Sequence, residues 1–302
     1  MRAADPVHGA HYLLTLFALA LLFAAAPASD YTGAAACKTC HPAEFTAQSS
    51  STHALALARS KPDQPGEWAF GAGSQAITFV SRADRDNYLE LGESWYRDGN
   101  GYALTPGHKS RAGERYRIFD PSAAILRCFG CHSTGTLTLA ADQAIVPAEL
   151  GVRCEACHGP GAKHAAIKNP GRFTANKINE LCGSCHRMPA SAVDGTDLRN
   201  PWNARHQPLM LAASACFRKS EGRLSCLTCH SPHSPLESNA AVYDARCGQC
   251  HEAPRHIKPV AGRSCVGCHM PAVRPQPNLK FANHRIAIYP PGDPLSPIRA
   301  RR

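Results

Sequence analysis

Cysteine and histidine are the residues of this sequence whose types and spacing point to chemistry. The 302-residue chain has 15 Cys and 16 His, and fourteen of the Cys lie in seven copies of one pattern, Cys-x-x-Cys-His. The seven copies are Cys37-Cys40-His41, Cys128-Cys131-His132, Cys154-Cys157-His158, Cys182-Cys185-His186, Cys226-Cys229-His230, Cys247-Cys250-His251 and Cys265-Cys268-His269. Two thiols three positions apart lie on one side of a helical turn, and the imidazole that follows points to the same side.

This pattern is the attachment signature of c-type haem. The two thiols form thioether bonds to the edge of the porphyrin, and the His binds the iron. Two other interpretations were weighed. Zinc sites do not need a His directly after every second Cys, and a thioredoxin-like redox pair would occur once rather than seven times. We therefore predict seven covalently attached c-type haems.

Seven further His lie outside the motifs once the N-terminal segment is set aside. They are His53, His108, His164, His206, His233, His256 and His284. A single His is often only a surface or core residue, but seven candidates for seven irons favour the set as distal ligands. Ligation by His keeps the reduction potential low, whereas ligation by Met raises it. We expect mostly bis-His, low-potential haems.

The spacing of two of these His limits which iron each can reach. Opposed ligand Cα atoms across one iron lie roughly 12–13 Å apart, whereas three residues span at most about 11 Å. His233 therefore cannot bind the iron of His230 and must serve a neighbouring haem. His164 follows His158 by six residues across the turn Gly159-Pro160-Gly161, and a neighbouring haem is again expected. Such cross-ligation predicts haems packed against one another.

The N-terminus predicts export. Leu13 to Ala26 form a continuous apolar run, and Ala26-Pro27-Ala28 is a small-residue cleavage site. The run is short for a membrane span. Because Arg2 is offset by Asp5, the charged leader is poor, and an uncleaved membrane anchor is the alternative. We expect a signal peptide over 1–28, a haem domain over 29–302, and a periplasmic or otherwise exported protein.

The elements that must position the motifs are expected to be mainly α-helical, with little other regular secondary structure. Residues 42–59 predict a helix that carries His53. Residues 76–80, 87–91, 94–97 and 102–105 predict short strands, which indicate a small β-meander in an insertion over 66–110, between the first and second motifs. The rest is expected to wrap short helices and loops around a chain of packed haems. The Pro-rich, basic tail over 290–302 is expected to be extended.

The net charge of the sequence must be corrected for the bound haems. The formal net charge of +10 suggests anionic partners, but each haem brings two propionates. Seven haems shift the charge by about −7 when ferric and about −14 when ferrous, so nucleic acid is excluded as a partner.

Cys216 lies outside every motif. It is either a buried unpaired thiol or one half of an intermolecular disulfide.

The motifs together resemble a known family. The stretches that carry the resemblance are Gly33-Ala34-Ala35-Ala36-Cys37 through His53, Trp95-Tyr96 leading to Thr105-Pro106-Gly107, Gly151-Val152-Arg153-Cys154 through Gly161 with His164, Ser214-Ala215-Cys216-Phe217 through His233, and Cys268-His269-Met270-Pro271 with His284-Arg285-Ile286. They resemble the multihaem cytochromes related to the tetrahaem electron acceptor of hydroxylamine oxidoreductase, with a cytochrome c-552/c-554-like domain. They are most similar to the branch often fused to tetratricopeptide repeats, which do not follow the seventh motif here.

The resemblance implies distal-ligand roles for His53, His164, His233 and His284. It supports His206 and His256 less, and His108 least. The expected function is electron transfer between a redox protein donor and acceptor, or within a membrane oxidoreductase complex. Because candidate distal His equal haems in number, no iron is left open and no catalytic residue is expected. The alternative is an oxidoreductase that acts on a small nitrogen or sulfur compound at one five-coordinate haem.

Overall fold

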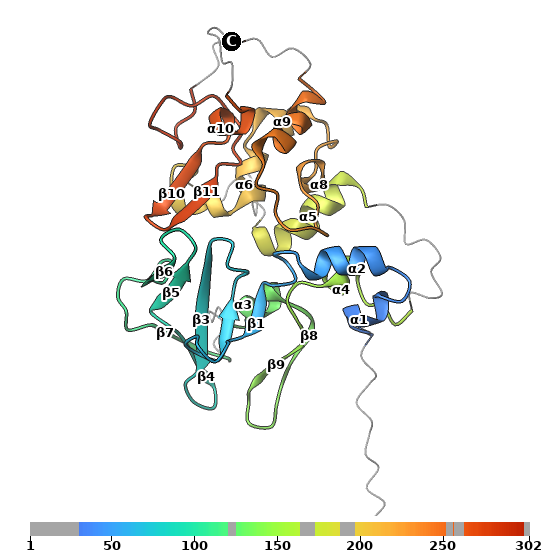
Figure 1. The fold of residues 1–302 in the computed structure, drawn as a ribbon, viewed down its shortest axis with the longest axis vertical. Helices are drawn as coiled ribbons and strands as arrows, with labels where there is room; N and C mark the ends of the chain where they lie inside the picture. The colour runs from blue at the N-terminus through green and yellow to red at the C-terminus, as the bar shows by residue number, and fades with distance from the viewer. Residues whose placement is uncertain are drawn as a thin grey trace, which may run out of the picture.

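The computed structural model describes residues 30–119, 125–163, 173–187, 197–251, 256 and 263–298. The predicted signal segment 1–28 and His164 lie outside these residues. The N-terminal half forms a sheet with helices beside it, and the C-terminal half lies above it as short helices and one hairpin (Figure 1). Of the described residues, 30% are helical and 22% are in strands. The prediction of a mainly α fold is therefore wrong, and the fold is mixed.

The largest element is a seven-stranded antiparallel sheet. Its strands are β1 (Leu57–Arg59), β2 (Trp68–Phe70), β3 (Ala76–Arg82), β4 (Asn87–Glu90), β5 (Glu93–Tyr96), β6 (Gly101–Leu104) and β7 (Glu114–Arg117). Four of them lie where the strand pattern predicted them. The order is β1-β2-β3-β4-β7, with β5 pairing β3 and β6 pairing β5. It is not a simple meander, because β4 pairs β7 instead of β5, and the strands extend beyond both ends of the predicted insertion 66–110.

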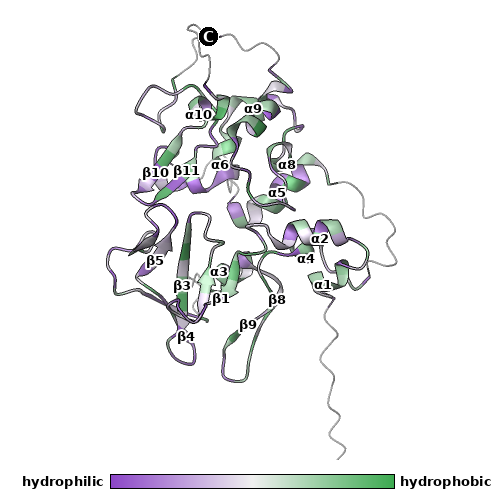
Figure 2. Ribbon diagram, in the orientation of Figure 1, coloured by the Kyte–Doolittle hydropathy of each residue, from purple (hydrophilic) through white to green (hydrophobic). Residues whose placement is uncertain are grey.

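The sheet builds its own apolar core around one phenylalanine. Phe129 lies in α3 (Ile125–His132), which carries the second motif. Its ring meets Trp68 and Phe70 edge-on at centroid distances of 5.0 Å and Tyr88 at 5.9 Å. Figure 2 shows the apolar character of β3 and α3. Aromatic rings packed edge to face stabilise a core beyond their buried area, so the sheet holds the second motif through α3.

The helix predicted over 42–59 is much shorter than expected. It is α2 (Pro42–Ser49), which follows α1 (Ala34–Cys37). After α2, two serine hydroxyls form hydrogen bonds with the backbone. Ser50 Oγ donates to Ala47 O, and Ser51 Oγ accepts from Ala54 N. Such local bonds compete with helix continuation. His53 therefore lies in a turn, and the chain enters β1 directly afterwards.

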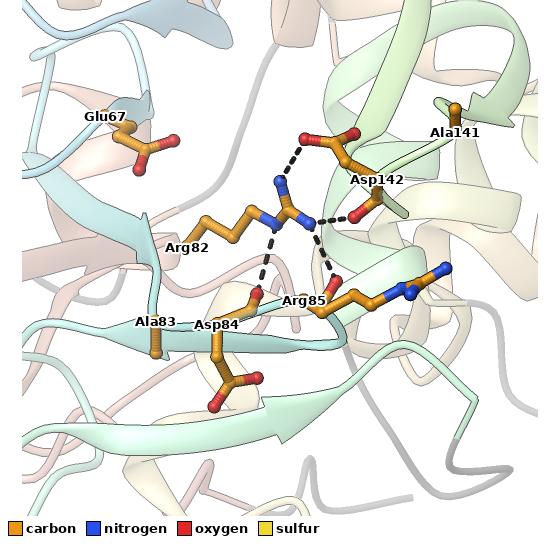
Figure 3. Close-up of a pocket in the computed structure, with 7 residues that line it drawn as sticks. All are labelled: Glu67, Arg82, Ala83, Asp84, Arg85, Ala141 and Asp142. Carbon is orange, nitrogen blue, oxygen red and sulfur yellow. Dashed lines mark hydrogen bonds and ion pairs between the residues drawn. The ribbon is translucent and has the colours of Figure 1, made fainter.

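Two hairpins lie outside the large sheet. They are β8 (Ser133–Leu139) with β9 (Ile145–Leu150), and β10 (Ala272–Gln276) with β11 (Leu279–Ala282). The Arg82 guanidinium connects the first hairpin to the sheet: Nη1 donates to Asp142 Oδ2 at 2.6 Å, Nη2 donates to the carbonyls of Asp142 and Arg85, and Nε donates to Asp84 O. Figure 3 shows this arrangement in a surface hollow, where it joins the β3–β4 turn to the β8–β9 turn.

Short helices make up most of the remainder. They are α4 (Cys154–His158), α5 (Ala175–His186), η2 (Pro201–Arg205), α6 (Gln207–Ala212), α7 (Ala215–Lys219), α8 (Cys226–Cys229), α9 (Ala240–Gly248) and α10 (Cys265–His269). No helix in the described part of the chain has the length and hydrophobicity needed to cross a bilayer. Residues 290–298 have no helix or strand, but Asn283 Nδ2 donates to Pro294 O at 2.8 Å, which ties this part of the tail to the body.

Candidate haem-binding sites

Each of the seven Cys-x-x-Cys-His motifs forms a helical turn. Four lie in α3, α4, α5 and α10, which extend through the His of their motifs. In the other three motifs a backbone hydrogen bond closes the turn. The backbone N–H groups of His41, His230 and His251 donate to the carbonyl of the first Cys of their motif at 2.8, 3.0 and 3.0 Å. A helical turn places both thiols and the imidazole on one side, as attachment of a porphyrin requires.

Four motif histidines face a histidine from elsewhere in the chain. The ring centroids lie 6.1 Å apart in His186–His53, 6.0 Å in His158–His233, 6.2 Å in His230–His284 and 6.3 Å in His269–His256. An iron between two imidazoles, with metal–nitrogen bonds of roughly 2 Å, holds the ring centres about 6 Å apart. The separations therefore match two rings that bind one iron from opposite sides.

Ordinary contacts between aromatic rings cover roughly the same range of distances, so the distance alone does not decide the matter. The composition of the pairs supports the assignment. Each pair joins one motif His to one His outside the motifs, and the four distances differ by only a few tenths of an ångström. His233 faces His158 and not the nearby His230. This agrees with the prediction that His233 lies too close to His230 in the sequence to bind the same iron. The residues present fit a haem with two axial His at each of these four places.

Hydrogen bonds orient several of these rings for metal binding. Nδ1 of His132 lies 2.9 Å from Ala56 O, and Nδ1 of His269 lies 2.9 Å from Ala287 O. Nδ1 of His284 lies 3.0 Å from Ala282 O. A backbone carbonyl at Nδ1 selects the tautomer whose Nε2 has its lone pair free for a metal. These carbonyls carry no sequence signal, and sequence reasoning missed them.

Comparison with known proteins agrees with this chemistry. Residues 94–159 match the family model for cytochrome c554 and c-prime. Over 140 residues, 40% of this chain, the sequence is 27% identical to the multiheme cytochrome MtrA of Shewanella baltica (strain OS185). Over these stretches the chain is similar to multihaem c-type cytochromes. The seven motifs and these similarities support covalent binding of c-type haem. The match spans 36% of the length of MtrA.

A solved structure shares the fold of this chain. The outer cell wall cytochrome OcwA superposes with a TM-score of 0.55 at 18% identity, over 85% of this chain and 80% of that one. The undecaheme cytochrome from the S-layer of Carboxydothermus ferrireducens gives a TM-score of 0.49 at 18% identity, over 88% of this chain and 53% of that one. The fold of this chain is therefore shared with a solved cytochrome, OcwA.

Burial favours the neutral form of six candidate ligands. It lowers the pKa of His53, His132, His186 and His230, and it lowers the pKa of His284 to about 4. The pKa of His206 is also lowered to about 4, by burial and then by Arg205 and Arg187. Only the neutral imidazole binds a metal, so these rings are in the ligating form at neutral pH.

Motifs that are distant in sequence lie side by side. The thiols of Cys37 and Cys154 are hydrogen-bonded, as are those of Cys131 and Cys185. The same contact joins Cys182 to Cys226, and Cys247 to Cys265. The first motif therefore lies against the third, the second against the fourth, the fourth against the fifth, and the sixth against the seventh.

Cys216 is a free, half-buried thiol.

A glycine brings the segment that carries His53 into place. Gly151 has a φ of +77°, and a Cβ at this position would collide with the carbonyl of Ala54. On the same segment Val152 N donates to His53 O at 2.8 Å, and the His53 ring donates to the carbonyl of Pro232. Close backbone approach at Gly151 therefore sets where His53 lies relative to α5.

His108 differs from the other candidate ligands. Its side chain is 3% exposed, and Nε2 lies 2.9 Å from Glu90 Oε2. The ring contacts between described residues do not include His108. The nitrogen that would bind an iron therefore faces a carboxylate in this structure. His164 lies outside the described residues, and His206 lies at the N-terminus of α6.

Proposed function

We propose that this cytochrome is an exported electron carrier with seven covalently attached haems, most of them held by two His. The observation that supports this most directly is the set of four imidazole pairs, each with one motif His and one His from elsewhere. Bound haem supplies one iron that takes up and releases one electron. The thiols fix each ring at its edge, and the paired His occupy both axial positions, which leaves no place at these irons for a substrate.

The distal ligands follow from the pairs. We assign His53 to the iron of His186, His233 to that of His158, His284 to that of His230, and His256 to that of His269. The irons of His41, His132 and His251 are left for His164, His206 and His108, the last only if its ring leaves Glu90.

The compartment and partners follow from the sequence together with the relatives. A signal segment over 1–28 would carry the chain across a membrane, and OcwA is named for the outer cell wall. Covalent haem attachment through two thioethers suits a protein that works outside the cytoplasm, where a loosely held cofactor would be lost. We propose a periplasmic or otherwise exported location, with a redox protein donor and acceptor or a membrane oxidoreductase complex as partners.

The haem count tests this proposal. Intact-mass measurement of the purified chain should give the processed polypeptide plus seven haems, and a pyridine haemochrome assay should give seven c-type haems per chain. Cys216→Ser is the matched control, since its thiol belongs to no motif and the count should stay at seven. Four or five haems in the wild type would contradict the proposal.

One observation favours a second candidate function. If His108 stays with Glu90, His164 and His206 alone remain for the irons of three motifs. One iron then keeps an open axial position, where a small nitrogen or sulfur compound could bind and react. Low-temperature EPR with a carbon monoxide titration separates the two functions. A carrier with seven bis-His irons is entirely low-spin and binds no carbon monoxide, whereas the enzyme shows one high-spin haem that binds it when reduced.

A further inference from the structure

The contact between His108 and Glu90 belongs to a larger polar cluster at one edge of the sheet. The Tyr116 hydroxyl lies 3.1 Å from the same Glu90 Oε2 and 3.0 Å from Glu114 Oε2. The nitrogen of His108 and the carboxylate oxygens of Glu90 and Glu114 all lie within 4.8 Å of one another. These residues come from β4, β7 and the loop between β6 and β7, at the β7 edge of the sheet (Figure 1).

The register of the strands makes this cluster costly without a cation. Glu90 and Glu114 are direct cross-strand partners in the β4–β7 pair, and like charges directly opposite each other destabilise a sheet. Tyr116 has one hydroxyl proton, so it donates to only one of the two carboxylates at a time. Among the ion pairs of the described residues, none joins Glu90 or Glu114 to a Lys or Arg.

The buried imidazole indicates which cation would bind. His108 is buried by the fold, its Nε2 points at the carboxylates, and its Nδ1 has no hydrogen-bond partner. Imidazole together with carboxylate suits zinc and similar transition metals, whereas magnesium and calcium prefer oxygen ligands alone. Ligand atoms on a tetrahedral zinc ion lie about 3.4 Å apart. The exposed Glu114 side chain would have to move closer to the other two ligands to reach this spacing.

We propose that Glu90, His108 and Glu114 bind one divalent transition-metal ion at a site separate from the haem irons. The ion neutralises the two facing carboxylates. It also ties the edge strand β7 and the loop that carries His108 to β4. Tyr116 packs against the same apolar core as Cys128 of the second motif, so the site would brace the wall of the sheet beside that attachment point.

Zinc uptake by the holoprotein tests the proposal. The purified, haem-loaded chain is stripped with a chelator, dialysed against zinc, and analysed for zinc and iron by mass spectrometry. We expect one zinc per chain above the background of surface sites, retained in the presence of excess calcium. His108→Ala and Glu114→Gln should each weaken uptake at least about tenfold, because each removes one ligand. Glu93→Gln is the matched control, since Glu93 pairs with Arg111, and it should leave uptake unchanged.

The haem spectrum separates failure here from failure of the proposed function. Because His108 would then bind zinc and no iron, His108→Ala should keep the haem count and every haem spin state of the wild type while losing zinc. Uptake that is equal in wild type and His108→Ala overturns the metal site and leaves the electron carrier untouched. A new high-spin haem in His108→Ala also overturns it, because His108 would then be an iron ligand. Glu114 is exposed, so Glu114→Gln should fold and report on the site even if His108→Ala does not.

Discussion

Single imidazoles carry most of the chemistry of this cytochrome, and their environments distinguish them. His284 faces His230 and is held by a backbone carbonyl at Nδ1, whereas His108 faces a carboxylate. Both are a lone His in the sequence, and only the family resemblance, which supports His284 and gives least support to His108, separates them. The motif residues could be predicted from the sequence because attachment is local. The partner of each iron could not, because it depends on which distant segment the fold brings close.

The His284→Ala substitution tests one pair directly. Removing this ring should leave the iron bound by His230 with one axial ligand, so one low-spin haem should become high-spin and bind carbon monoxide when reduced. The haem count should not change, since both thioethers at Cys226 and Cys229 remain. EPR and optical titration measure both effects. A full set of low-spin signals that persists in His284→Ala would contradict the assignment.

Glu155 is a single residue that should make the stability of the fold depend on pH. It lies inside the third motif, and its carboxylate accepts from the N–H groups of Thr32, Gly33 and Gly161 at 2.9, 2.8 and 2.6 Å. Burial alone would raise the pKa of Glu155, but these hydrogen bonds outweigh it and lower the pKa. A lowered folded-state pKa stabilises the fold above the unfolded-state value, and this stability is lost as the pH falls through the folded-state value.

The Glu155→Gln variant should therefore be less stable than wild type at neutral pH and should lose less stability on acidification. Hydrogen bonds to a charged acceptor contribute about 1.5–3 kcal/mol each, so the difference at neutral pH should be measurable by denaturant unfolding. Glu180→Gln, an exposed residue of α5, is the control. Parallel pH profiles for wild type and Glu155→Gln would show that this carboxylate does not link the N-terminal segment to the third motif.

At the scale of elements, the sheet is the part that sequence patterns described least well. Alternating apolar residues marked four strands correctly, because side-chain periodicity is local. Their order was wrong, because β7 follows a loop and pairs back to β4, and no local signal marks that return. The helix after Pro42 ended early because Ser50 and Ser51 bind the backbone. The mixed fold arises from these longer-range pairings.

Phe129→Ala tests whether the sheet holds the second motif. The substitution removes the ring that contacts Trp68, Phe70 and Tyr88, and loss of a buried Phe costs about 3–5 kcal/mol. We expect a clearly lower unfolding midpoint with the haem count unchanged, because the thiols of Cys128 and Cys131 remain. Phe119→Ala, at an exposed ring, is the control. A midpoint equal to that of wild type would mean that haem contacts, and not this core, hold α3.

At the scale of the whole molecule, the charge of the apoprotein differs from that of the working protein. The sequence has a formal charge of +10 and an isoelectric point near 9.0. The propionates of seven haems would remove most of this excess. The assembled protein should therefore meet its redox partners with little net charge, so that association depends on local patches.

Isoelectric focusing checks this expectation. The oxidised holoprotein should focus well below pH 9.0, the value for the sequence, and full reduction should lower it further because each iron loses one positive charge. The control is the same chain with its seven motif His intact but both thiols of one motif replaced, which removes one haem and should raise the isoelectric point. A holoprotein that focuses at the sequence value would contradict seven bound haems.

The four imidazole contacts also dictate how the chain is assembled. His53 contacts a residue of α5, and His158 contacts a residue that follows α8 in the sequence. His230 contacts His284, near the C-terminus. Long loops must close before such contacts form, and closing them is slow. The N-terminal half therefore cannot form all of these contacts until the C-terminal segments have been synthesised. Attachment of the porphyrins thus has a time window in which every motif is still accessible, and arrival of the last segment closes it.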